Sequence, residues 1–82
     1  MRNIRYNLIF HPEPKGGFTV IVPSLPGCVS YGANIEDARE MARDAIHAYI
    51  ASLKKHREPV PIPDDRDFLG FVELALPASA YA

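Results

Sequence analysis

The sequence predicts a small α+β domain with the order β-β-β-α-β. A three-stranded antiparallel meander comes first, one helix packs on one face of this sheet, and a last strand joins its edge. The chain has 82 residues, of which 48% are hydrophobic, so it can bury one thin core and no second lobe. Two short runs have apolar residues at every second position, a third short run follows them, and a later run has helical periodicity. We expect one domain over residues 1–77 and a frayed tail over 78–82.

The first three strands are expected at residues 4–10, 17–22 and 28–31. Each of the first two has apolar residues at every second position, which is typical of a strand with one buried face. Segments rich in proline and glycine separate the three runs, and such residues favour turns. In this alternation Ile9 and Ile21 fall on the face that the main core does not use.

The clearest single element is a helix that begins after Asn34. Its apolar stripe repeats every three or four residues and consists of Ile35, Ala38, Ala42, Ala45, Ile46, Tyr49, Ile50 and Leu53. Asn34 is a suitable N-cap, and Asp37 can reach back as in a capping box. Burial of each large apolar side chain contributes about 1.5–3 kcal/mol, so packing on the sheet decides this helix.

An extended connection with prolines at 59, 61 and 63 follows the helix, and a last strand is expected from Leu69 to Leu76. One helix covers only one face of a sheet. The other face, with Ile9, Ile21 and Phe71, therefore predicts an oligomer interface, and we expect a homodimer or tetramer.

Composition and motifs argue against several classes of function. Nine basic and ten acidic residues give a net charge of −1, so nothing attracts the chain to nucleic acid or to an anionic membrane. No apolar run is long enough for a signal peptide or a membrane span, and Cys28 stands alone, so we expect a cytoplasmic protein. His11, His47 and His56 have no metal-ligand spacing, and no cofactor is expected.

The acidic residues also fail to form a catalytic set. The strand order is similar to the start of the ribonuclease H fold, whose chemistry needs carboxylates on the first and fourth strands and on the helix. The first strand here has none, and Glu73 is alone on the last. Cys28 is expected to be a small buried hydrophobe without a partner base. We therefore expect a binding protein and not an enzyme.

Two motifs together resemble the HicB antitoxin family. Residues 23–28 read Pro-Ser-Leu-Pro-Gly-Cys, and residues 35–38 read Ile-Glu-Asp-Ala at the start of the helix. Family members read Pro-Asp-Leu-Pro-Gly-Cys and, after Gly-Asp-Thr, Glu-Glu-Ala. Ser24 stands where aspartate is usual, and Ala33 and Asn34 replace Asp-Thr. The resemblance covers roughly residues 4–76.

The resemblance implies a partial ribonuclease-H-like fold without nuclease activity. It also implies a partner, a small basic HicA-type toxin that cleaves messenger RNA and whose active site the antitoxin covers. Many family members continue into a DNA-binding domain. None is present in these 82 residues, so direct DNA binding by this chain alone is not expected.

A basic toxin would favour an acidic contact surface. The densest acidic segment, interleaved with prolines, consists of Glu58, Asp64, Asp65 and Asp67. These four are the predicted toxin-binding residues. A plain solvated connection remains the alternative for the segment, and the polar helix face is a second docking surface. An oligomeric regulatory or small-molecule-binding domain without a toxin partner remains the alternative function.

Overall fold

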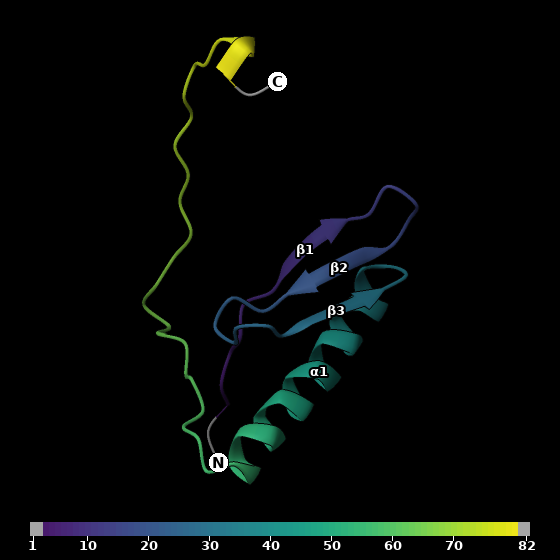
Figure 1. Ribbon diagram of the computed structural model, residues 1–82, viewed down its shortest axis with the longest axis vertical. Helices are drawn as coiled ribbons and strands as arrows, with labels where there is room; N and C mark the ends of the chain where they lie inside the picture. Colours follow the sequence, from purple (N-terminus) through teal and green to yellow (C-terminus); the bar gives the residue numbers. More distant parts are fainter. Residues whose placement is uncertain (1–2, 81–82) are drawn as a thin grey trace.

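The computed structural model describes residues 3–80 and has two layers, a small sheet and one helix (Figure 1). The elements are β1 (Ile9–Pro12), β2 (Phe18–Ile21), β3 (Val29–Gly32), α1 (Ile35–Lys55) and the 3₁₀ turn η1 (Ala78–Ala80). The strands are antiparallel in the order β1-β2-β3, and α1 packs mainly on β3 and β2. The predicted meander and its helix are confirmed. Within the described residues, no helix is long and apolar enough to cross a membrane.

The strand register divides the sheet into two faces of different character. Phe10, Val20 and Ser30 lie opposite one another across the three strands, on the face that α1 covers. Val20 is completely buried there. Because side chains alternate along a strand, Ile9 and Ile21 lie on the other face, as the alternation predicts.

The core lies between the sheet and α1 and has two adjoining clusters. Val20 packs against Ala38 and Ala42 of α1, and Val22, Leu25 and Cys28 form the second cluster under the later turns of the helix. Small residues on α1 let it approach the sheet closely. A Cβ atom added at Gly32 would overlap the backbone and the Cβ atom of Ala38, so only glycine fits where β3 meets the start of the helix.

Both ends of α1 are stabilised by hydrogen bonds that the sequence encodes. The side chain of Asn34 accepts a hydrogen bond from the Asp37 amide at 2.8 Å, and Asp37 accepts one from the Ala33 amide at 2.8 Å. At the other end Arg57 has a positive φ of 57°, and the Glu58 amide donates to the Leu53 carbonyl at 2.9 Å. This is a Schellman ending, in which glycine is the usual residue at the position of Arg57.

The first strand begins later than predicted. Residues 4–8 are extended and alternate between half-buried and exposed side chains, yet the paired strand runs only from Ile9 to Pro12. Pro12, which the sequence places in the loop, is instead the end of the strand opposite Phe18. A proline is tolerated here because β1 is an edge strand, where a missing amide donor breaks no hydrogen bond of the sheet.

The last predicted strand, Leu69 to Leu76, is not part of the sheet. This stretch is extended but pairs with no strand among the described residues, and every residue in it is exposed. Its apolar residues occur on both faces of the extended chain, and a sheet with one helix covers only one face. An apolar run can therefore indicate a strand without fixing where it pairs. The ribonuclease-H-like character of the fold stays a prediction.

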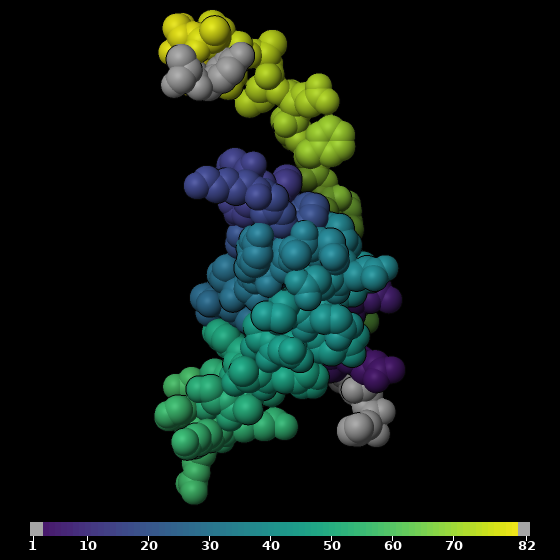
Figure 2. Space-filling view, turned by 90° about the vertical axis from the view of Figure 1, so that its right-hand side faces the viewer, coloured from purple at the N-terminus to yellow at the C-terminus, as the bar shows by residue number. Residues whose placement is uncertain are grey.

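Residues 68–76 project away from the two layers as an arm (Figures 1 and 2). Of the tail predicted at 78–82, residues 78–80 form η1, and residues 81 and 82 lie outside the described part. The Tyr6 hydroxyl donates a hydrogen bond of 2.7 Å to the Pro61 carbonyl. This contact holds the proline-rich connection against the N-terminal segment before the arm begins.

Candidate protein-binding surface

The face of the sheet opposite α1 carries a row of β-branched side chains. Ile9, Ile21 and Val29 lie opposite one another across the three strands and are 48%, 41% and 54% exposed. Such cross-strand neighbours touch and form one continuous apolar strip. The sequence predicts Ile9 and Ile21 on this face. It misses Val29, whose strand is too short to show a clear alternation.

The second apolar surface is the arm, which we define as residues 68–76. Its large side chains are between 54% and 91% exposed and comprise Phe68, Leu69, Phe71, Val72, Leu74 and Leu76. Phe71, which the sequence groups with Ile9 and Ile21, therefore lies on the arm and not on the sheet. Contiguous exposed apolar surface of this kind marks sites of protein association.

The four predicted toxin-binding carboxylates are all exposed, but they do not form one cluster. Asp64, Asp65 and Asp67 share a turn in which the Asp67 amide donates to the Asp64 carbonyl at 3.1 Å. Glu58 follows the helix end, with the proline-rich connection between it and the turn. The structure brings three of the four together.

Within this turn, Asp64 is already engaged by a neighbour. Arg66 donates to both of its oxygens, from Nε at 3.0 Å and from Nη2 at 2.8 Å. These side-chain hydrogen bonds, with one from the Arg66 amide, lower the pKa of Asp64. Asp65 and Asp67 have no ion-pair partner among the described residues, so they carry the free negative charge of the turn.

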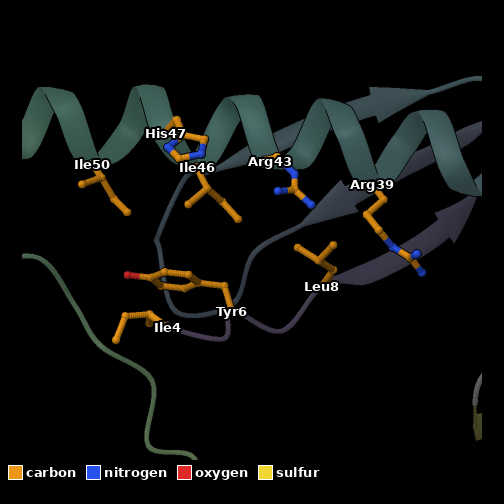
Figure 3. A pocket seen from close by; sticks show the side chains of 8 residues that line it. All are labelled: Ile4, Tyr6, Leu8, Arg39, Arg43, Ile46, His47 and Ile50. Carbon is orange, nitrogen blue, oxygen red and sulfur yellow. The ribbon is translucent and has the colours of Figure 1, made fainter. Parts of the chain in front are cut away.

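A cleft of about 500 Å³ opens between α1 and the chain that leads into β1 (Figure 3). Its floor and rim are apolar, and they consist of Ile4, Tyr6, Leu8, Ile46 and Ile50. Three basic or titratable side chains from successive turns of the helix, Arg39, Arg43 and His47, complete the lining. From the sequence, these three side chains are expected only on the polar face of the helix, opposite its apolar stripe. Their spacing of four residues is the signal that could have grouped them.

The residues considered for chemistry stay apart from one another. Cys28 is 5% exposed in the core, and burial raises the pKa of its thiol. His56 lies at the helix end, where its Nδ1 is 2.8 Å from the Ser52 carbonyl oxygen, whereas His11 is on β1. Among residues 3–80, no group of three histidine, cysteine or acidic side chains could hold a metal ion.

Comparison with known proteins identifies the family. Residues 6–69 match the family model described as HicB-like antitoxin of bacterial toxin–antitoxin systems. The chain is 41% identical over 58 residues to a UPF0150 protein of Thermoplasma acidophilum, a match that covers 71% of this chain and 84% of that protein.

Some longer relatives carry the antitoxin name. Antitoxin HicB 1 of Photorhabdus laumondii is 32% identical over 63 residues, which cover 77% of this chain and 41% of the relative. Antitoxin HicB of Escherichia coli K12 is 28% identical over 60 residues, with coverage of 73% and 44%. The matched region thus spans less than half the length of these two antitoxins. The family match extends over most of the chain, which therefore belongs to the HicB-like antitoxin family.

Proposed function

We propose that this chain is an antitoxin that binds a small basic HicA-type toxin and neutralises it by covering its mRNA-cleaving site. In this proposal residues 1–77 work as one domain, in the cytoplasm, without catalysis, DNA contact or cofactor of their own. The observation that carries it is the family match over residues 6–69. The open sheet face and the arm support it, because both are apolar surfaces suited to association.

The acidic turn is the part of the chain best suited to meet a basic partner. A protein that binds RNA presents positive charge, and complementary charge speeds and orients association. Asp65 and Asp67 supply that charge, while the Asp64–Arg66 pair fixes the shape of the turn. The prolines before the turn restrict the chain, so less conformational entropy is lost when a partner binds. Glu58 adds a fourth carboxylate at the start of the same segment.

Self-association is the second part of the proposal. The strip of Ile9, Ile21 and Val29 and the apolar side chain of Phe71 would be covered in a homodimer or tetramer. Sedimentation at tens of micromolar is expected to give a mass of at least two chains. A strict monomer at that concentration would remove this part of the proposal and leave toxin binding to be judged separately.

Toxin neutralisation can be tested with a small basic protein encoded beside this gene. Co-expression of the antitoxin is expected to restore growth of cells that produce that protein, and the purified pair is expected to lose RNA cleavage. Asp65→Asn combined with Asp67→Asn should weaken binding about tenfold, a change in the usual range for lost charge pairs at an interface.

The matched control is Glu40→Gln combined with Asp44→Asn, which removes the same charge from the exposed side of α1. It should bind as the unchanged chain does. An equal loss of toxin binding in both double variants would indicate a general charge effect and would argue against a specific role of the acidic turn in the contact. Failure to bind or inhibit any neighbouring gene product would contradict the antitoxin function itself.

A further inference from the structure

The molecule exposes far more surface than a compact chain of its mass. Its accessible surface is 7130 Å², about 2,200 Å² more than the roughly 4,900 Å² expected at this size. The radius of gyration is 16.0 Å, whereas a compact chain of this length has about 12 Å. The arm contributes to this excess, because its large apolar side chains are 54% to 91% exposed and it projects from the rest of the molecule (Figure 2).

A place for one more strand is open beside β1. The strand order β1-β2-β3 leaves the outer edge of β1 without a partner among the described residues. Because α1 packs mainly on β3 and β2, it does not cover this edge closely. The space on the helix side of the edge is continuous with the cleft of Figure 3, which has an apolar floor. An unpaired edge with an apolar cleft next to it is suited to accept an extended segment by strand addition.

The arm has the composition of such a strand. Phe68, Val72, Leu74 and Leu76 fall on one of its faces, and Leu69, Phe71, Glu73 and Ala75 fall on the other. Glu73 is the sole charged residue from Phe68 to Ala80, and the cleft carries Arg39 and Arg43. If Glu73 of the added strand faces these arginines, the other face of that strand, with Val72 and Leu74, lies on the open side of the sheet. There it would extend the row of Ile9, Ile21 and Val29.

We propose that two copies of this chain exchange their arms, so that residues 68–76 of each copy form a fourth strand on the free edge of β1 of the other. The inference rests on the self-association in the proposed function and is independent of toxin binding. A strand that is apolar on both faces needs cover on both, and one copy has a helix on only one. Two copies supply the second layer, because their open sheet faces can meet where the exchanged strands join them.

The area available fits a permanent dimer. The excess of about 2,200 Å² per copy amounts to about 4,400 Å² for two copies, which is within the range of permanent homodimer interfaces, roughly 2,000–5,000 Å² in total. Phe68 and Leu69 already line a hollow with Asn7, Leu8 and Ile9, so the arm leaves its own body beside the strand edge. The same geometry in the second copy makes the exchange two-fold symmetric, the commonest arrangement in homodimers.

Cross-linking distinguishes exchange from folding back onto the chain's own edge. In a Cys28→Ala background, one copy carries His11→Cys on β1 and a second copy of different mass carries Val72→Cys on the arm. A short bismaleimide is expected to cross-link the two chains of different mass to each other. Asp44→Cys in place of His11→Cys is the control and should not link. A chain with both cysteines that links only within itself, or no link at all, would overturn the exchange.

Mass measurements on arm variants complete the test. Val72→Asp and Phe71→Asp should convert the dimer to a monomer, with association at least tenfold weaker, whereas Ala78→Asp just beyond the arm should keep the dimer. The circular dichroism of α1 should persist in all three, because the arm contributes nothing to the core. A dimer that survives Val72→Asp would overturn the exchange, even if the same protein still neutralised a toxin.

Discussion

The body of this chain, which contains β1–β3 and α1, and the arm, residues 68–76, are both rich in apolar side chains, but a core of them is buried in the body, whereas those of the arm are exposed. In the body, Leu25 and Val20 are completely buried between the sheet and α1. In the arm, Leu74 is 75% exposed and Phe68 is 91% exposed. The difference is the presence of a second layer. An apolar residue is buried only where another element covers it, and within residues 3–80 no element covers the arm.

Truncation of one leucine in each region gives the largest expected contrast. Leu25→Ala should lower the free energy of unfolding by about 2–5 kcal/mol, because it removes buried contacts and leaves a cavity. Leu74→Ala should change it by less than about 0.5 kcal/mol in dilute monomer, as expected for an exposed position. Urea unfolding at submicromolar concentration measures both. Equal losses in the two variants would show that the arm belongs to the folded monomer.

Addition of a methyl group gives the next contrast. Gly32→Ala should cost about 1–3 kcal/mol, since its Cβ atom would overlap Ala38 and force α1 away from β3. Gly70→Ala is the matched control, because the space around Gly70 in the arm is open. It should leave thermal unfolding unchanged. A tolerated alanine at position 32 would contradict the close helix–sheet contact.

The helix cap belongs to the body and should have a moderate effect. Asn34→Ala removes the side chain that accepts the Asp37 amide and should cost about 1 kcal/mol. Asn7→Ala is the control, because Asn7 is an exposed asparagine outside the helix. Chemical denaturation followed by circular dichroism at the helix band measures both. If Asn7→Ala lowers the free energy of unfolding as much as Asn34→Ala does, the result would argue against a specific contribution of the cap.

The smallest effect is expected at the turn before the arm. The hydrogen bonds from Arg66 lower the pKa of Asp64 in the folded chain, so any stabilisation from this pair is present at neutral pH and is lost as the pH falls through that lowered pKa. Arg66→Gln should raise the pKa of Asp64 toward its usual value, which NMR titration of the carboxyl carbon would record. Because both side chains of the pair are exposed to solvent, the unfolding midpoint should change little. An unaltered Asp64 titration would contradict the pairing.

Local patterns in the sequence predicted the body well. The alternation of Ile9 and Ile21 and the capping pair Asn34 and Asp37 depend on residues close in the chain, and the structure agrees with both. The packing of Val20 against Ala38 and Ala42 follows once the apolar stripe of the helix and the buried face of the strand are known.

Predictions failed where the outcome depends on distant partners. The apolar run at 69–76 indicates a strand, but its pairing depends on which edge and which covering layer are available. The acidic residues were predicted as one segment, yet the link between Arg66 and Asp64 alters which charges are free. The cleft with Arg39 and Arg43 arises because α1 is displaced toward β3, which no local pattern encodes.

Hydrogen exchange of the backbone amides in the arm tests most directly whether this apolar segment exists to associate with another chain. Their exchange should slow markedly as the protein concentration rises from below one micromolar to tens of micromolar, while the amides of α1 stay protected throughout. Exchange of residues 68–76 at the rate of an unfolded peptide at every concentration would contradict the account.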